Sequence, residues 1–174
     1  MRSKTANVFL VLTFAFSATA LAPDPNLLPV NITIKSAEGN FAPVSGVTYE
    51  LVFDKEIPWT DSNGANNSDD AAVEFSSGQP KTLSCELLFD TYKKREDVTG
   101  TGPSQLLKLA DADPALKRPP MVTFTWGPGK NTFNGVIQTV GVKYTMFLPD
   151  GTPCRATVNL KVKEANKASF KKKD

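Results

Sequence analysis

Two carboxylates in the segment "KTLSCELLFD", Glu86 and Asp90, have the best spacing for chemistry in this sequence. Residues four positions apart share a face of an alternating strand, and such a pair could act as general acid and general base. Leu88 lies between them on that face, and no other polar group of the segment converges on them. We therefore expect no catalytic role for the pair.

Other catalytic and metal-binding arrangements are excluded by composition. The chain has no histidine among its 174 residues, which rules out Ser–His and Cys–His nucleophiles and every His-ligated metal site. Two cysteines, Cys85 and Cys154, cannot build a four-thiolate site. "GPGKN" lacks the residues of a phosphate loop, because Phe124 and Asn131 occupy the positions of its first glycine and its Ser/Thr. We expect no enzyme activity, no cofactor and no metal.

The length and charge of the chain favour one domain with a basic end. The net charge of +2 is too small to indicate a nucleic-acid partner, and basic residues are not interleaved with aromatic ones. We also find no sign of a small-molecule substrate. From Arg155 to the end there are seven basic and two acidic residues, a net charge of +5. The tail at 165–174 is either simply solvated or docks on an acidic neighbour.

The N-terminal segment 1–29 combines a signal-like start with a proline-rich linker. Arg2 and Lys4 precede an uncharged run, Val8 to Ala22, that ends in small residues, the pattern of a secretory signal. The run is too short to cross a membrane, which takes about 20 residues. The alternative is an arm that packs on a partner. Prolines at 23, 25 and 29 disfavour regular structure, so the folded domain is expected to span 30–164.

Alternating hydrophobicity predicts a mainly β fold. We expect one short helix near residues 103–111, with an apolar stripe of Leu106, Leu107 and Ala110, and a loop at 60–72. Strands are expected at 30–35, 47–53, 81–90, 121–126 and 132–142, followed by a hairpin at 144–164. Such a set favours an antiparallel pair of sheets or a small barrel.

The last hairpin has the best-specified register. Pro149, Asp150 and Gly151 form its turn. The inward row of its second strand holds Cys154, Ala156, Val158, Leu160 and Val162. The opposite row holds Arg155, Thr157, Asn159, Lys161 and Lys163. Cys85 lies on a similar apolar row, so both cysteines are expected to be reduced core residues.

Several short motifs together resemble the tube-protein domain of contractile injection systems, which drive a spiked inner tube through a membrane. The motifs are Phe89-Asp90-Thr91-Tyr92, Arg118-Pro119-Pro120, Trp126-Gly127, Tyr144 with Phe147, and Pro149-Asp150-Gly151. The likeness spans about Val30 to Glu164 and is strongest after Ser76. It implies an antiparallel two-sheet β-barrel, related to phage tail-tube proteins, that forms a hexameric ring.

The resemblance also implies a function in assembly. The ring would belong to the inner tube or to the tube–spike junction at the baseplate, with the chain itself and the tube, spike and baseplate subunits as partners. The motif residues would then serve assembly, and the row from Arg155 to Lys163 would face the lumen or a neighbouring subunit. Such particles are assembled in the cytoplasm. The alternative function is a secreted β-sandwich binding module, which the N-terminal segment and sequons at Asn31 and Asn66 would suit.

Overall fold

The computed structural model describes residues 28–38, 41–62, 72–75, 77–166 and 170, and the side chains of 60–62 and 72–74 are not among what it describes. The signal-like segment therefore lies outside the described residues, as does most of the basic tail. The elements are β1 (Val30–Ser36), β2 (Val44–Thr48), β3 (Leu51–Asp54), β4 (Trp59–Ser62), β5 (Ala72–Phe75), β6 (Thr82–Asp90), a 3-10 turn η1 (Tyr92–Lys94), α1 (Pro103–Ala110), β7 (Met121–Trp126), β8 (Asn131–Phe147) and β9 (Pro153–Glu164).

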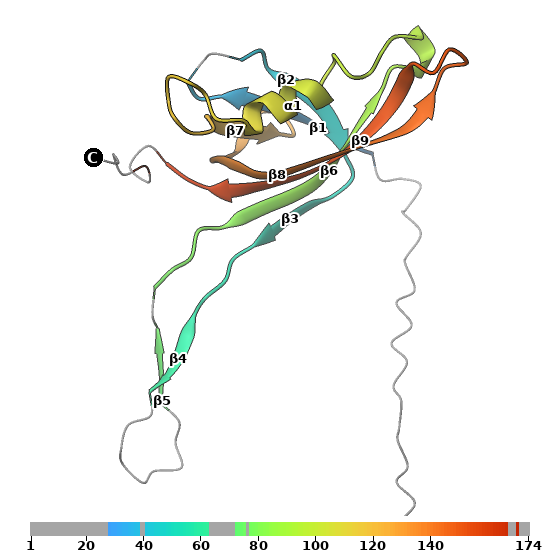
Figure 1. Ribbon diagram of the computed structural model, residues 1–174. Helices are drawn as coiled ribbons and strands as arrows, with labels where there is room; N and C mark the ends of the chain where they lie inside the picture. Colours follow the sequence, from blue (N-terminus) through green and yellow to red (C-terminus); the bar gives the residue numbers. More distant parts are fainter. Residues whose placement is uncertain (1–27, 39–40, 63–71, 76, 167–169, 171–174) are drawn as a thin grey trace, which may run out of the picture.

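Seven of the strands form one antiparallel sheet in the order β2-β1-β7-β8-β9-β6-β3. Strand β2 also pairs with β6 through Val47 and Leu88, so the pairings β1, β2, β6, β9, β8 and β7 form a closed circuit. Figure 1 shows that β1, β2 and β7 lie with α1 in one layer, and that β8, β9, β6 and β3 lie in a second layer. We call the second layer the four-strand layer.

The core fills the space between the two layers. Phe124, Ile32 and Ile34 from one layer and Leu83, Leu87 and Val158 from the other are essentially inaccessible to solvent. Burial of alternate residues is strict on β9, where the five residues of the expected inward row are all buried. Alternation therefore predicted the buried face of this strand correctly.

A two-stranded arm projects from the four-strand layer. It continues the β3 and β6 ribbons and ends in β4 and β5, which pair with each other from Trp59↔Phe75 to Ser62↔Ala72 and form a separate sheet. Figure 1 shows this arm pointing away from the body. The sequence predicted a loop over 60–72, but the ends of that segment are strands.

The structure confirms a mainly β, antiparallel architecture with one α-helix among the described residues, although the strands were expected in two sheets and seven of them belong to one. The expected strand at 47–53 is wrong as a single element, because β2 ends at Thr48 and β3 begins at Leu51. The Thr48 hydroxyl donates to the Glu50 carbonyl over 2.9 Å and accepts the Glu50 N–H over 3.3 Å, and these bonds close the bend between β2 and β3. Helix α1 lies where it was expected.

The buried face of α1 differs from the expected stripe. Leu106 and Leu109 are fully buried, whereas Leu107 is 44% exposed. The prediction that Leu107 packs inward is therefore wrong, because the helix is rotated so that Leu109 meets the sheet. Cys85 and Cys154 are both buried and free, as expected.

Candidate functional site

The outer face of the four-strand layer, which points away from the core, carries the polar row predicted from the sequence. Arg155 and Thr157 are half-buried, and Asn159, Lys161 and Lys163 are exposed. Their register partners on β6 and β8 are polar or small as well. Asn159 pairs with Glu86 and Gly141, and Lys161 pairs with Ser84 and Thr139. The outer face is therefore polar, shallow and built mostly of small or flexible side chains.

Charge on the outer face is divided into a paired and an unpaired part. Arg155 is held by Asp90, with Nε donating over 3.0 Å and Nη2 over 2.5 Å. The backbone N–H of Tyr92 donates to the other oxygen of Asp90 over 2.8 Å. This N–H and, secondly, the Arg155 guanidinium hold the pKa of Asp90 below its ordinary value. Among the described residues, Lys161 and Lys163 have no ion pair.

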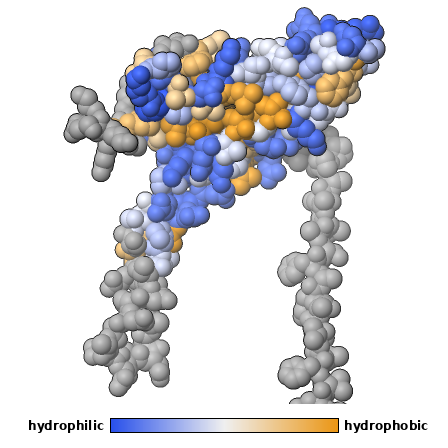
Figure 2. Space-filling model, viewed as in Figure 1, coloured by the Kyte–Doolittle hydropathy of each residue, from blue (hydrophilic) through white to orange (hydrophobic). Residues whose placement is uncertain are grey.

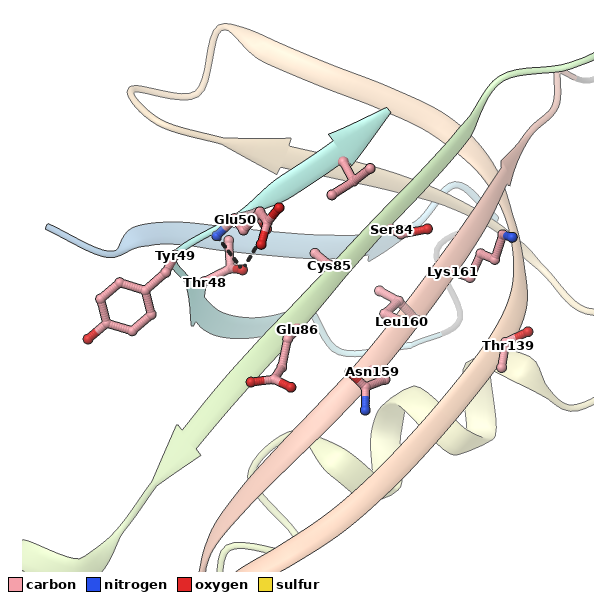
Figure 3. Close-up of a pocket in the computed structure, with 11 residues that line it drawn as sticks. Thr48, Tyr49, Glu50, Ser84, Cys85, Glu86, Thr139, Asn159, Leu160 and Lys161 are labelled. Carbon is pink, nitrogen blue, oxygen red and sulfur yellow. Dashed lines mark hydrogen bonds between the residues drawn. The ribbon is translucent and has the colours of Figure 1, made fainter. Parts of the chain in front are cut away.

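A shallow groove of about 530 Å³ runs along the outer face beside β3. Figure 3 shows Glu86, Ser84 and Lys161 projecting into it from β6 and β9, with Tyr49 at its rim. No hydrogen bond joins any two of Ser84, Glu86 and Lys161 in this part of the structure. These three residues of the groove therefore lack the hydrogen bond between a nucleophile and a base that activates the nucleophile in nucleophilic catalysis.

The two residues of the candidate acid–base pair have different surroundings in the structure. Asp90 is engaged by Arg155 and Tyr92, while Glu86 lines the groove four residues away.

No group of three metal-binding side chains is found within the described part of the chain. In the same part, none of the helices has the length and apolar character needed to cross a membrane.

Two edges of the four-strand layer have no strand partner among the described elements. On β8, β7 pairs only with residues 131–136, so one edge of Ile137–Phe147 is open while β9 covers the other. At the opposite end of the layer, β3 pairs only with β6. Open edges present unpaired N–H and C=O groups and readily accept another strand.

The first group of sequence motifs meets at one end of the four-strand layer, which we call the tip. Phe89 is buried, and Thr91 Oγ1 donates to the Glu96 carbonyl over 2.6 Å and to the Cys154 carbonyl over 3.1 Å. These contacts attach η1 to the β8–β9 hairpin. Its turn is closed by the N–H of Gly151, which donates to the Leu148 carbonyl, and Gly151 has a φ of +87°.

Not all motif residues at the tip are used in folding. Tyr92 and Phe147 are 54% and 56% exposed, although each belongs to a motif of the resemblance. Asp150 accepts the N–H of Thr152, so it supports the turn, as does Pro149 before it. Tyr144 packs against the core.

The second group of motifs lies toward the other end of the sheet. Arg118 donates to Glu38 over 3.0 Å and to the Pro119 carbonyl over 2.9 Å, and Glu38 also accepts the N–H of Met121. The Arg118 guanidinium stacks on the Phe170 ring at 3.8 Å. Pro120 is buried beside it. These contacts fix the start of β7.

Trp126 and Gly127 complete this second group. The Trp126 ring lies 5.6 Å from that of Phe53 at the root of the arm. Gly127, with a φ of +65°, begins the turn between β7 and β8. The segment "GPGKN" therefore forms a hairpin turn, since Trp126 pairs with Asn131.

The arm was not predicted from the sequence. Trp59 and Phe75 face each other there with ring centroids 5.8 Å apart, and they are 59% and 56% exposed. The only local signal was an aromatic residue on each side of a long polar segment. Both strands have four residues, too few for alternation to indicate them.

Comparison with known families decides between the two functional interpretations. A family model described as contractile injection system tube protein matches residues 46–173. The chain belongs to this family. The resemblance drawn from the motifs is thereby confirmed. No curated protein matches the chain.

Membership of the tube-protein family makes the chain a structural tube component of a contractile injection system. The match begins within β2 and leaves out β1, which nevertheless pairs with both β2 and β7. The folded unit therefore extends beyond the matched residues on the N-terminal side.

Proposed function

We propose that the chain forms a hexameric ring of the inner tube, or of the tube–spike junction at the baseplate, and that it acts by assembly rather than catalysis. The observation that carries this proposal is the pair of open edges on opposite sides of the four-strand layer. Membership of the tube-protein family supports a structural role in the particle. The number of six subunits in the ring is what the resemblance implies.

The two open edges have compatible strand directions. Each neighbouring pair in β8, β9, β6 and β3 is antiparallel, so β3 runs opposite to β8. If β3 of one copy lies beside Ile137–Phe147 of the next copy, the antiparallel order continues without interruption. Such a head-to-tail contact forms a closed ring when the rotation between copies closes, and closure removes the exposed edges.

In this ring the outer face of the four-strand layer lines the lumen. The core side of the layer is covered by β1, β2, β7 and α1, so only the polar face remains for the interior of the tube. We propose that Arg155, Thr157, Asn159, Lys161 and Lys163 form this surface. The closed circuit of pairings in each subunit fits the β-barrel of tail-tube proteins.

The ring is tested by light scattering and negative-stain electron microscopy of the purified full chain. We expect six-fold rings. Val52→Lys places a charge on the exposed edge strand β3 and is expected to shift rings to monomers. Leu107→Lys adds the same charge at a similarly exposed apolar residue of α1, away from both open edges, and is the matched control. A monomer at every concentration, without association to tube or spike subunits, contradicts the proposal.

The orientation of the ring is tested by labelling single cysteines. Asn159→Cys lies on the proposed lumen surface, and Lys108→Cys lies on the exposed side of α1. In assembled tubes, a large polyethylene-glycol maleimide should label Lys108→Cys but not Asn159→Cys, while a small maleimide labels both. Equal labelling of both positions by the large reagent would place the row outside the lumen.

The compartment of assembly is part of the same proposal. We propose assembly in the cytoplasm, followed by deployment of the particle outside the cell or at its envelope. Mass spectrometry of the native N-terminus tests this. Retention of Val8–Ala22 supports it, whereas a chain that begins near Leu21 or Pro23 indicates export.

A further inference from the structure

The open edge of β3 lies close to the point where the N-terminal part of the chain enters the fold. Val30, the first residue of β1, pairs with Thr48, the last residue of β2. Strand β3 begins at Leu51, directly after the bend that follows Thr48. The chain before Val30 therefore reaches the body beside the start of β3.

The pairings of β1 and β2 lead onto this edge. Strands β2 and β3 both pair antiparallel with β6, so they run in the same direction along it. Strand β1 is antiparallel to β2 on the side away from β6, since Val47 pairs with Asn31 on one side and with Leu88 on the other. A continuation of β1 toward the N-terminus would therefore run antiparallel along the open side of β3. Figure 1 shows β3 at the border of the four-strand layer, with no described strand beyond it.

A proline-rich link separates this point from the next segment that could form a strand. Pro23, Pro25 and Pro29 lack the N–H group that a strand ladder needs. The seven residues 23–29 can span about 23 Å when extended, whereas the step from Thr48 to Leu51 is about 10 Å at strand spacing. The link is long enough to bring residue 22 to the start of β3.

The segment before the link has the composition of a buried strand. From Val8 to Ala22 it contains no charged residue, and its first part reads VFLVLTFAF. These residues are mostly β-branched, aromatic or leucine, the types that suit a strand. Five successive apolar positions, Val8–Leu12, suit a strand that is covered on both faces.

The β3 edge offers apolar surface on both faces. Val52, whose partner Ser84 belongs to the outer face, is 39% exposed, and Phe53 on the opposite face is 47% exposed. Tyr49 in the bend and Leu28 before β1 are more exposed still. Figure 2 shows apolar side chains of the body next to the polar root of the arm. A strand with apolar side chains on both faces would cover Val52 on one side and Phe53 on the other.

We infer that the open edge of β3 binds the chain's own apolar run, Val8–Phe16, before the chain joins a ring. The contact is an antiparallel strand pairing that adds one strand to the four-strand layer. The proposed ring gives the same edge to Ile137–Phe147 of the neighbouring copy, so the inference rests on the proposed function and states how that contact is regulated. The run and the neighbouring β8 compete for β3, and ring formation displaces the run.

The outcome of this competition depends on the concentration of the chain. A segment tethered by a short flexible link has an effective concentration in the millimolar range, so the run occupies the edge in dilute single chains. In a closed ring each chain has two contacts with neighbours, whereas the run supplies one. Rings therefore form above a threshold concentration. Below it, the run covers an edge that would otherwise pair unspecifically.

Hydrogen exchange tests the contact in single chains, without rings. The full chain is compared with a variant that carries Leu10→Lys and Leu12→Lys, at concentrations where light scattering shows single chains. Charges in the run should release it from the apolar edge. The β3 amides that point away from β6 should then exchange at least tenfold faster than in the unchanged chain.

A matched control adds the same two charges elsewhere. Leu107→Lys with Ala115→Lys places them at exposed residues of α1 and of the loop that follows it, and its β3 amides should exchange like those of the unchanged chain. Equal exchange in all three proteins overturns the inference. A native N-terminus that begins near Leu21 or Pro23 also overturns it, because the run is then absent.

The threshold for ring formation tests the regulation. In a dilution series followed by light scattering, the Leu10→Lys, Leu12→Lys variant should form rings at a concentration at least tenfold lower than the unchanged chain and the control. An unchanged threshold overturns the inference and leaves the proposed ring intact. A chain that forms no rings at any concentration contradicts the proposed ring instead, and hydrogen exchange then still decides whether the run pairs with β3.

Discussion

Asp90 on β6 and Arg155 on β9 are register partners whose side chains form a two-point ion pair at the tip of the four-strand layer. The same carboxylate accepts the N–H of Tyr92 and thereby fixes the start of η1. One residue thus joins two strands to the turn that presents Tyr92. An ion pair with about a third of each side chain exposed contributes little to stability, so its main effect is on the position of the tip.

The stability contributed by Asp90 should depend on pH. Its pKa is lowered in the folded chain, first by the Tyr92 N–H and then by Arg155. The contribution is therefore present above the ordinary carboxyl pKa and is lost as pH falls through the folded value. We expect Asp90→Asn to cost up to about 1 kcal/mol at pH 7. Urea unfolding of both proteins between pH 7 and pH 2 should show the difference closing in acid. A difference that stays constant over this range would contradict the assignment.

Gly135 should not tolerate a side chain, although it lies in an ordinary strand. A Cβ at this position would overlap the carbonyl of Lys163 on β9. We expect Gly135→Ala to destabilise the fold by about 1–3 kcal/mol through overpacking. Gly141→Ala on the same strand is the control, because its Cβ would meet Asn159 at an ordinary 3.9 Å. Chemical denaturation of the two variants gives the comparison, and equal stabilities would refute the prediction.

Gly151 should be required for its conformation rather than for space. Its φ is +87°, and a Cβ added there would meet no atom within 4 Å beyond the adjoining residues. Left-handed backbone geometry is unfavourable for a β-branched residue, so Gly151→Val should lower the free energy of unfolding by about 1–2 kcal/mol. Gly78→Val, also in open space but without a positive φ, should have a much smaller effect. An unchanged melting temperature for Gly151→Val would defeat the prediction.

The thiol of Cys85 should be inert in the folded chain. Burial raises its pKa to about 12, and the thiolate is the reactive form. We expect neither cysteine to react with Ellman's reagent at pH 8 until the chain is unfolded, after which two thiols should be titrated. Rapid reaction of the native protein would show that the strand faces open or that the burial is incomplete.

Local sequence patterns predicted the two faces of β9, the turn of the last hairpin and the family of this protein. Alternation on β9 identified the buried row and the polar row, and the Pro149–Gly151 turn formed where it was expected, because both depend on neighbours in the chain. The expected regular register of the hairpin is wrong, since the β8–β9 pairing shifts between Ile137 and Thr139 and twice more between Tyr144 and Phe147. The motif series also indicated the family, and the family match over residues 46–173 confirmed it.

Only the tertiary structure decided which strands meet and which edges stay open. Residues 47–53 were expected to form one strand, yet the chain bends after Thr48, because β2 pairs along its length with β1 whereas β3 pairs only with β6. Leu109 rather than Leu107 is buried, since the rotation of α1 depends on the sheet below it. The open edges and the arm follow in the same way from pairings between distant segments, which local periodicity does not specify.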